Sequence, residues 1–481
     1  RTAGLGHEIG EILGASGPFC FELGDCVRVV VGHDAVVAVG HQSTHDVCAH
    51  PAESDHRQLH HCLHSWGNPA GCSLACTHLL GVRYVGYRRS SSAWGGVVVE
   101  ITGFVEDGYG AIADAFRANW ELGEEVGAGF SLVHDGKLVV DLTGGTADDS
   151  GRVYDAETLQ LVFSSTKGVA AICLAMLVQA GRLDYEAPVS SIWPEFCAAG
   201  KGDLPVSWAI SHRAGLASVD NPPPLEEVLA VTPIVEAIAA QVPLWELDGS
   251  HGYHAITYGW IAAEILRRVT GIRMNDWLQT NVVEPLGIEF HMGLPESEHA
   301  RVAPIRNSSS SIDPERFALM MSLIGPETMG GRALSLDGRF SFSGENTFNR
   351  GDVWSSEIPG AAGITNARSL AMIYGATVGE VGGVRLLDDA TRELATTPVT
   401  SGPDKSLVME TKFGMGFMLP DGVVPFAGPR SFGHPGAGGS LGYADPDLGI
   451  GYGYVMNQMA SGFLGDLRTT RLTEAVVNCV S

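Results

Sequence analysis

The sequence predicts an α+β fold in which helices flank one antiparallel sheet and a mostly helical subdomain is inserted into the chain. Three observations lead to this prediction. Strand–turn–strand patterns occur in two distant places, at residues 129–141 and 440–456. A helix that is apolar on every side follows Ser164, which is typical of the middle of a domain. Helical, loop-rich sequence fills the interval from about 182 to 354. We therefore expect the strands on either side of that interval to join in a single sheet.

The composition is that of an ordinary globular protein with a large acidic excess. The 481 residues are 45% hydrophobic and 18% charged, with a formal net charge of −25. This charge argues against nucleic acid and anionic membranes as partners. No apolar run reaches the roughly 18 residues that a membrane-spanning helix needs. No basic segment leads into an apolar one at the N-terminus, so we expect no secretory signal. The chain begins at Arg1 rather than Met, so an upstream segment can be missing.

The nine cysteines are unevenly placed along the chain. Six of them precede residue 98, and the other three are Cys173, Cys197 and Cys479. These three stand in apolar surroundings, which is typical of reduced core cysteines. Because structural disulfides are rare in the cytosol, this usage predicts a cytoplasmic protein. The sequence leaves the oligomeric state open, a homo-oligomer included.

Residues 1–97 differ in character from the rest of the chain. They contain no lysine, most of the cysteines and ten of the seventeen histidines. Dense Cys/His clusters lie at residues 56–64 and 72–78. Such a density could bind zinc, but the spacings do not repeat the paired C-x2-C pattern of zinc sites. We expect an appended, poorly structured segment of unknown role and no metal site, with zinc binding as the open alternative.

Beyond this segment the pattern becomes regular. Apolar side chains recur at helical spacing between residues 109 and 120, which predicts an amphipathic helix. Two strand-like runs, 129–134 and 137–141, then flank the dipeptide Asp135-Gly136. Asp-Gly between alternating runs is the strongest local signal for a two-residue hairpin. This region therefore predicts a helix followed by two paired antiparallel strands.

The central stretch of the chain is residues 163–168, with the sequence Phe-Ser-Ser-Thr-Lys-Gly. The ten residues that follow are small or apolar, and Gly181 supplies the left-handed residue beyond a helix end. Ser164 and Lys167 are three residues apart and are therefore neighbours on one helical face. Burial lowers the pKa of such an amine, so that it can accept a proton near pH 7. A serine that touches a neutral amine is an activated nucleophile.

The S-x-x-K pattern alone is a weak signal, because serine and lysine coincide at this spacing in many chains. The alternative is a serine N-cap followed by a surface lysine in the first turn of the helix. The chain has few lysines, however, namely Lys137, Lys167, Lys201, Lys405 and Lys412. Only Lys167 has a serine three residues before it.

The remaining segments predict helices, connections and a second hairpin. Residues 258–269 have the pattern of an amphipathic helix that ends at Thr270-Gly271. We expect mobile connections at the serine run 308–311 and at Gly330-Gly331. After about residue 355, strand signals return at 413–419, 440–445 and 450–456, and residues 467–480 close the chain as a helix.

These patterns divide the chain into an N-terminal segment, 1–97, and one domain, 98–481. Within the domain we expect an α/β part made of residues 98–181 and 355–481. The helical insert is expected to span about residues 182–354.

Four stretches of the domain together resemble the motifs of one enzyme superfamily. Residues 164–167 match its S-x-x-K box. Residues 252–259 occupy the place of its Tyr-x-Asn box, and residues 433–439 that of its Lys-Thr-Gly box. Residues 211–216 are similar to a further stretch common in these enzymes. With all four in order, residues 98–481 resemble the serine β-lactamase/penicillin-binding-protein superfamily, most closely the family VIII carboxylesterases and related class C β-lactamase-like hydrolases. The resemblance implies a β-lactamase/transpeptidase-like fold and a serine hydrolase without a cofactor.

The resemblance also implies roles for individual residues. Ser164 would attack an acyl carbon, and Lys167 and Tyr253 together would take its proton and return one later. For a tyrosine with a free pKa of about 10, this requires a cation such as Lys167 to favour the phenolate. The N–H groups of Ser164 and of Ala437, on a strand edge, would bind the oxyanion. Glycines beside Ala437, Gly436 among them, would let substrate approach that edge.

Two departures from the β-lactamase motifs bear on the substrate. Ala255 stands where β-lactamases have an asparagine that holds the substrate amide, and His434 stands where they have a lysine that helps to bind the carboxylate. Both changes resemble the esterase branch and should weaken β-lactam recognition more than ester recognition. We therefore expect hydrolysis of short-chain carboxylic esters. Trp245 and Trp354 are expected to line the pocket, which would suit uncharged acyl groups.

Other functions remain open at this point. A β-lactamase or D-alanyl-D-alanine peptidase would use the same fold and nucleophile. A non-catalytic scaffold would keep the fold for self-association. For single residues the alternatives are a core aromatic at Tyr253 and a structural loop histidine at His434.

A second serine motif has to be excluded. Residues 438–442 spell G-x-S-x-G, the nucleophile elbow of α/β-hydrolases. That fold places its acid and then its histidine after the serine. The last histidine of this chain is His434, which precedes Ser440, so the required order is impossible. A strand-and-turn pattern rather than a helix follows Ser440.

Overall fold

A computed structural model describes residues 99–307, 318, 321–342, 344–460 and 466–481, together with the backbone of three short strands before residue 40. The chain divides into two compact units, Arg1–His78 and Leu79–Ser481. In the first unit, β1 (Phe19–Glu22), β2 (Arg28–Gly32) and β3 (Ala35–Val39) pair antiparallel in that order, a hairpin pattern that we did not expect there. The Cys/His clusters at 56–78 and the serine run 308–311 lie outside the described residues.

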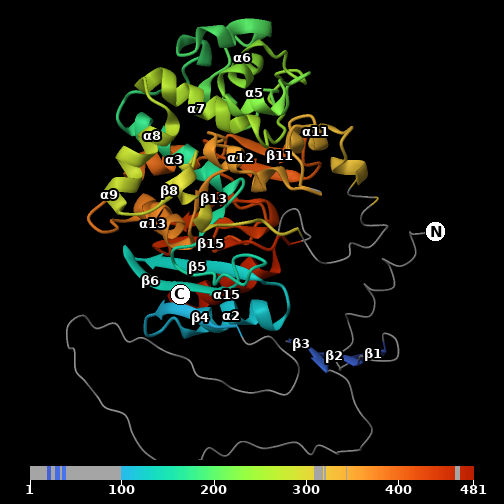
Figure 1. Ribbon diagram of the computed structural model, residues 1–481, viewed down its shortest axis with the longest axis vertical. Coiled ribbons are helices and arrows are strands. Elements are labelled where there is room, and N and C mark those ends of the chain that lie inside the picture. The colour runs from blue at the N-terminus through green and yellow to red at the C-terminus, as the bar shows by residue number, and fades with distance from the viewer. Residues whose placement is uncertain are drawn as a thin grey trace, which may run out of the picture. The chain divides into compact units, whose positions relative to one another are not determined.

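The second unit contains a six-stranded antiparallel sheet built from both ends of the domain. In Figure 1 the cyan strands β5 and β6 lie beside the red strand β15, although they are far apart in sequence. This confirms the predicted sheet and both predicted hairpins. The spatial order is β13 (Phe432–Pro435), β14 (Leu441–Asp445), β15 (Ile450–Met456), β5 (Gly127–His134), β6 (Lys137–Gly145) and β4 (Ile101–Val105).

The first hairpin forms around the dipeptide that predicts it. Asp135 has a φ of 47° and Gly136 a φ of 76°, so both central residues are left-handed, as a type I′ turn requires. His134 and Lys137 are the last paired residues on either side. Aspartate and glycine are among the residues that reach this region at low cost.

The two faces of β15 differ because glycine and tyrosine alternate along it. A Cβ on Gly451 would lie 2.2 Å from the backbone nitrogen of Gly375, and one on Gly453 would lie 2.2 Å from the carbonyl oxygen of Ala367. Helix α13 (Ala367–Val378) therefore packs directly on the strand backbone. On the other face, Tyr452 meets Phe130 of β5 with ring centroids 5.0 Å apart. The aromatic layer on that face continues to helix α2 (Gly110–Glu121), which confirms the first predicted helix.

The S-x-x-K motif lies at the start of helix α3 (Ser165–Gln179), which has Ser164 as its N-cap residue and is buried almost throughout. Helix α7 (Thr257–Thr270) packs beside α3, and it ends at Gly271 with a φ of 82°. Gly181 likewise has a φ of 66° beyond the end of α3. The two helix predictions are therefore confirmed, together with the predicted terminal helix α15 (Leu467–Val480).

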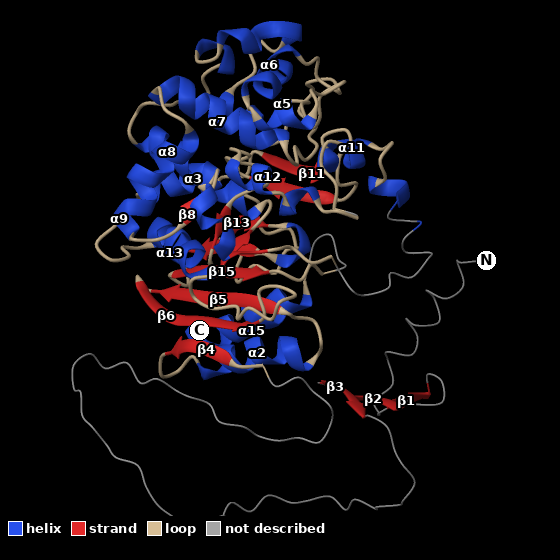
Figure 2. Cartoon of the chain, viewed as in Figure 1, coloured by secondary structure: helices blue, strands red, loops and turns tan. Residues whose placement is uncertain are grey.

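The remaining elements are short and surround α3. Figure 2 shows α5, α6 and α7 gathered away from the strands of the six-stranded sheet. The other helices are α4 (Val206–Ile210), α5 (Leu225–Leu229), α6 (Thr232–Ala240), α8 (Met274–Leu278), α9 (Glu284–Leu286), α11 (Met329–Ser335), α12 (Gly351–Ser355) and α14 (Asp389–Thr396). The other strands form a sheet in the order β8 (Phe290–His291), β10 (Ile364–Thr365), β7 (Leu159–Leu161) and β9 (Val302–Ala303), and a pair of β11 (Thr400–Pro403) and β12 (Glu410–Phe413).

Three predictions about local structure are wrong. Gly330 and Gly331 do not form a mobile connection but lie buried in α11, where a Cβ on Gly331 would be 2.0 Å from the carbonyl oxygen of Gly325. Residues 414–419 are not a strand, because Gly416 turns the chain with a φ of 87°. Cys197 is exposed in the 3₁₀ segment Pro194–Gly200 rather than in the core.

The helices and strands do not test the predicted domain boundaries. The boundary after residue 97 and the 182–354 insert stay predictions. Of the helices in the described residues, none is both long and apolar enough to cross a membrane.

Candidate active site

Ser164 occupies the entrance of α3 and is the accessible point of a buried stretch. From residue 158 to 175 every residue is buried except Ser164, which is partly exposed. Phe163, just before it, has a φ of 45°, a strained conformation for a bulky side chain. Strain of this kind persists only where the surrounding structure holds it, and it gathers at functional sites. The chain therefore turns sharply at Phe163 and presents the hydroxyl of Ser164.

Lys167 is completely buried one turn along the same helix face. Its Nζ lies 3.0 Å from Ser164 Oγ, 2.6 Å from the carbonyl oxygen of Ala255 and 2.5 Å from that of Gly360. Burial lowers the pKa of the Lys167 amine well below its usual value. A neutral amine has two N–H donors, which the two carbonyls accept, and one lone pair. The lone pair is then left to face the Ser164 hydroxyl.

Tyr253 lies beside two aromatic rings, those of Phe413 and His434. Its ring is stacked 6.1 Å from Phe413 and 5.8 Å from His434, measured between centroids. Its hydroxyl is hydrogen-bonded with Ser164, and its backbone N–H donates to Asp404 Oδ1 at 2.9 Å.

The charge state of Tyr253 differs from the sequence expectation. Burial raises the pKa of the Tyr253 phenol well above its usual value, and the hydrogen bond with Ser164 offsets this only in part. Burial likewise lowers the pKa of Lys167, whose Nζ lies 4.9 Å from the Tyr253 ring centre. Desolvation disfavours both charges. Burial therefore favours the neutral form of both side chains, which agrees with the lowered pKa predicted for Lys167 and disfavours a phenolate at Tyr253.

His434 is buried with an exposed fraction of 1% and has a defined tautomer. Its Nδ1 lies 2.7 Å from the carbonyl oxygen of Pro435, which can only accept, so the ring proton is on Nδ1. Nε2 is then an acceptor, 3.4 Å from the Tyr253 hydroxyl. Burial and the neighbouring Lys167 lower the pKa of His434 to about 3. The imidazole is therefore neutral and orients the tyrosine hydroxyl.

The turn after β13 lies directly against the start of α3. A Cβ on Gly436 would be 2.1 Å from Ser440 Oγ and 2.3 Å from the carbonyl oxygen of Val162. Ser440 is buried, and its hydroxyl donates to that carbonyl at 2.8 Å. The serine of the G-x-S-x-G motif is thus occupied in joining the two segments.

Ala437 opens the one-turn 3₁₀ helix Ala437–Gly439 and does not lie on the strand edge itself, as we had expected. The backbone bonds around it run from Gly436 to Ser440 and from Gly439 to Gly436. In the described part of the chain, the N–H groups of Ser164 and Ala437 have no protein acceptor. Two N–H donors of this kind are what the binding of an oxyanion requires.

The predicted lining residues divide into those near the site and one that is not. The side chain of Ala255 is only a methyl group, and its carbonyl oxygen accepts a hydrogen bond from Lys167. Trp245 stands edge-on to His254, next to Tyr253, at 5.9 Å. Trp354 instead meets His299 at 5.3 Å and donates its indole N–H to the carbonyl oxygen of Phe348.

Aromatic rings from two other segments adjoin the nucleophile turn. Phe342 and Phe348 lie 5.5 Å and 5.0 Å from the ring of Phe163. No contact in the described residues joins Trp354 to Ser164, Lys167 or Tyr253. Phe163 and its neighbours are therefore better candidates than Trp354 for the wall beside the nucleophile.

Sequence reasoning missed three residues that position the site. Gly360 contributes a carbonyl to Lys167, and no local pattern signals a carbonyl. Asp404 is buried and holds the backbone of Tyr253. His212 has a φ of 68° and stands 4.9 Å from the Tyr253 ring. Only His212 had a signal, because it lies in the family-like stretch 211–216.

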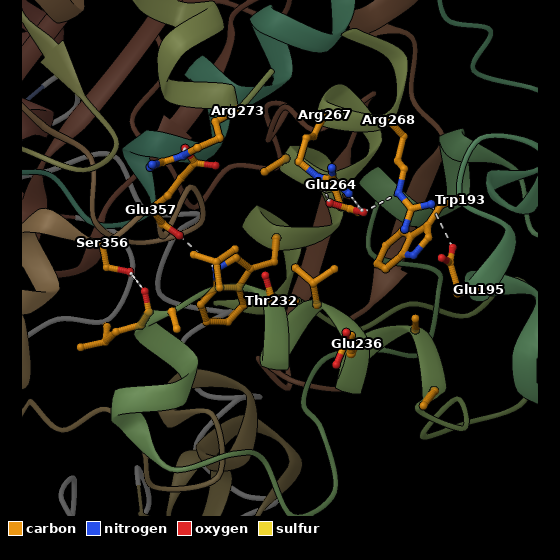
Figure 3. A pocket seen from close by; sticks show the side chains of 18 of the residues that line it. Trp193, Glu195, Thr232, Glu236, Glu264, Arg267, Arg268, Arg273, Ser356 and Glu357 are labelled. Atoms are coloured by element: carbon orange, nitrogen blue, oxygen red, sulfur yellow. Dashed lines mark hydrogen bonds and ion pairs between the residues drawn. The ribbon is translucent and has the colours of Figure 1, made fainter. Parts of the chain in front are cut away.

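A cavity of about 740 Å³ lies elsewhere, between α6, α7 and residues 355–357. Figure 3 shows Arg267 and Arg268 turned toward Glu264, and Arg268 also toward Glu195, at one end of this cavity. None of the predicted site residues lines it. In the residues that the structure describes, no three His, Cys, Asp or Glu side chains are placed to hold a metal ion.

Comparisons with known proteins show the family and the fold of the chain. The family model described as Beta-lactamase matches residues 112–476. The chain is 33% identical over 375 residues to Esterase/beta-lactamase LipL of Mycobacterium tuberculosis (strain ATCC 25618 / H37Rv), covering 75% of this chain and 84% of that protein.

Two solved structures are similar to this chain over their own full length. The crystal structure of a family VIII carboxylesterase is 33% identical with a TM-score of 0.71, and covers 79% of this chain and 100% of that one. A novel penicillin-binding protein homolog from Caulobacter crescentus is 34% identical with a TM-score of 0.70 and the same coverage. The fold and the resemblance predicted from the motifs are confirmed by these matches.

Proposed function

Because the chain belongs to the beta-lactamase family, we propose that it is a serine carboxylesterase that hydrolyses short-chain carboxylic esters through an acyl-enzyme on Ser164. The chain is a serine hydrolase by its family. The identity of the nucleophile, its activation and the preference for esters are the proposed parts. They are supported by the contacts of Ser164, Lys167, Tyr253 and His434.

The first half of the reaction forms the acyl-enzyme. Ser164 Oγ bonds to the acyl carbon while its proton passes to Lys167 Nζ, 3.0 Å away. The carbonyl oxygen becomes an oxyanion between the N–H groups of Ser164 and Ala437. The bond to the leaving alkoxide then breaks, and the alkoxide receives the proton that Lys167 took, relayed through the Tyr253 hydroxyl. The products are a neutral alcohol and an ester on Ser164.

The second half repeats these steps with water. Water adds to the acyl carbon as its proton passes to Lys167, and the oxyanion forms in the same place. The bond to Ser164 Oγ breaks, Oγ recovers the proton, and a carboxylic acid leaves. Lys167 can act as a base in both halves because it begins each one neutral, which its burial favours.

The observation that carries the preference for esters is the state of His434. At the position where β-lactamases have a lysine, this chain has a buried, neutral imidazole whose Nδ1–H is held by Pro435. It offers no positive charge to a substrate carboxylate. Ala255 offers no amide to a substrate side chain. A neutral ester needs neither group.

A β-lactamase or D-alanyl-D-alanine peptidase is the second candidate. It is favoured by the name of the relative LipL, which includes both esterase and beta-lactamase, and by the similarity to a penicillin-binding protein homolog. A non-catalytic scaffold would not need a lysine buried against a serine. The cytoplasmic location stays a prediction.

Hydrolysis of p-nitrophenyl butyrate and nitrocefin by the same preparation tests the proposed substrate class. A charge-assisted hydrogen bond contributes about 1.5–3 kcal/mol, so the lack of one to the substrate carboxylate should lower kcat/KM for β-lactams by about 10- to 150-fold. Each kcat/KM is divided by the rate constant of the uncatalysed reaction of the same substrate. We expect this normalised value to be higher for p-nitrophenyl butyrate than for nitrocefin by at least that factor. Equal or higher normalised values for nitrocefin would instead assign the chain to the second candidate.

A further inference from the structure

A buried arginine lies behind the turn that carries Ala437. Arg468, in the first turn of α15, is 1% exposed. Its guanidinium donates to three carbonyl oxygens, those of Gly438 at 2.7 Å, Gln458 at 2.8 Å and Glu124 at 3.2 Å. It also donates to two carboxylates, the buried Glu125 at 3.1 Å and the partly buried Asp466 at 2.6 Å. All three guanidinium nitrogens of Arg468 therefore donate hydrogen bonds.

Two acids pair with Arg468 in this cluster. Asp466 pairs with two of its nitrogens, and the Asp466 side chain also accepts from the Arg468 backbone N–H at 2.9 Å. Burial raises the pKa of Glu125 to about 7, against the opposing effects of Arg468 and Tyr454. A buried ionic cluster of this kind is weak evidence for stability, because desolvation offsets the attraction. Its place in the structure therefore calls for another explanation.

The turn itself has little rigidity of its own. Gly436, Gly438 and Gly439 surround Ala437, and Gly438 and Gly439 have φ values of 81° and 125°. Three glycines in four residues allow many backbone conformations. One side of the turn is held by Ser440 through Val162. The other side is held by Arg468 at the Gly438 carbonyl.

The contact between the turn and the arginine is close. A Cβ on Gly439 would lie 2.6 Å from Arg468 Nη2 and 2.1 Å from Asp466 Oδ2. The Gly438 carbonyl, which Arg468 holds, also accepts from the backbone N–H of Ala460 at 2.9 Å. The same peptide carries the Gly439 N–H, which donates to the Gly436 carbonyl oxygen at 3.2 Å. The Gly436 carbonyl and the Ala437 N–H share one peptide plane, so holding the Gly438 carbonyl restricts the direction of the Ala437 N–H.

We infer that Arg468 is a positioning residue that holds the Ala437 N–H in the geometry needed to bind the oxyanion. The inference rests on the proposed acyl-transfer function. Arg468 does not touch substrate, and it acts through Gly438. Because the N–H matters most when negative charge has formed on the substrate oxygen, loss of Arg468 should affect the transition state more than substrate binding.

The test compares Arg468→Lys and Arg468→Met with Arg471→Met. Arg471 is on the same helix but pairs with Asn119 and Glu124, and it does not contact the turn. Arg468→Lys keeps the positive charge and loses the planar guanidinium group with its several N–H donors. Displacing a catalytic group by about 1 Å can cost about 100-fold. We expect kcat for p-nitrophenyl butyrate to fall about 10- to 100-fold in the Arg468 variants, with KM within about threefold of wild type and Arg471→Met unchanged.

A second readout separates positioning from a general structural role. Affinity for an alkyl boronic acid, which forms a tetrahedral adduct resembling the transition state, should fall in parallel with kcat. If Arg468→Met does not fold, both kcat and the boronate affinity are measured on Arg468→Lys. A folded Arg468 variant with wild-type kcat and boronate affinity would overturn the inference. Failure of the proposed function is a different result, in which wild type itself shows no ester turnover that depends on Ser164.

Discussion

Replacing Ser164 with alanine is expected to abolish ester turnover, lowering kcat by at least about 10⁴-fold. The reason is that no other hydroxyl in the described site is both accessible and in contact with a neutral amine. Removal of the hydroxyl also leaves the lone pair of Lys167 without its proton donor. The measurement is the kcat for p-nitrophenyl butyrate in wild type and Ser164→Ala, with circular dichroism to show that both are folded.

Ser440→Ala is the matched control for this variant. Ser440 is the serine of the G-x-S-x-G motif, and its hydroxyl is buried against Val162. Its loss removes the hydrogen bonds with the Val162 carbonyl and the Ser165 hydroxyl. Each is worth about 1 kcal/mol, so turnover should fall by no more than about thirtyfold. Turnover that survives in Ser164→Ala and disappears in Ser440→Ala would place the nucleophile at the elbow motif and exclude the present mechanism.

Lys167→Met is expected to lower kcat by about 10²- to 10⁴-fold, the usual contribution of a general base. The substitution keeps the length and the burial of the side chain and removes the nitrogen. Only neutral lysine accepts the Ser164 proton, so wild-type kcat/KM should fall when the pH drops through the Lys167 pKa. Burial lowers that pKa well below the value of a free lysine, so activity should already be high far below pH 10. A pH–rate profile of wild type and the residual activity of Lys167→Met measure both effects.

Lys201→Met provides a control for burial alone. Lys201 is also fully buried and also donates to two carbonyl oxygens, those of Ala198 at 2.8 Å and Gln241 at 2.6 Å. It has no serine partner. Thermal unfolding should show a loss of stability in both variants, whereas only Lys167→Met should lose turnover. Comparable kcat losses in the two variants would mean that Lys167 acts through the fold and not as a base.

The parts of the fold that the sequence predicted are those with a local cause. Asp135-Gly136 predicted its hairpin because the turn requires two left-handed residues. The alternation of glycine and tyrosine at 450–456 predicted a strand, and Gly181 and Gly271 marked two helix ends. Ser164 and Lys167 were brought together because three residues along a helix is a fixed geometry.

The parts that the sequence did not predict depend on distant packing. Helix α13 was missed because its small, apolar residues match the glycine face of β15, a fit that no local pattern shows. Gly330 and Gly331 looked like a flexible link, but α11 uses them for close backbone contact. The Gly360 carbonyl reaches Lys167 from 193 positions away.

The charge states of the site needed the structure as well. The apolar helix already predicted a lowered pKa for Lys167, but the resemblance suggested a phenolate at Tyr253. Burial of both side chains disfavours both charges, the phenolate included. Extent of burial is a property of the whole fold, and a four-residue motif does not contain it.

Covalent labelling is the most direct test of the proposal that Ser164 is the nucleophile. Wild type and Ser164→Ala would be treated with a fluorophosphonate probe, which bonds to activated serines, and examined by intact mass and peptide mapping. We predict one probe per wild-type chain, on the peptide that contains Ser164, and none on the variant. A probe on Ser440 or any other serine, or equal labelling of Ser164→Ala, would contradict the account.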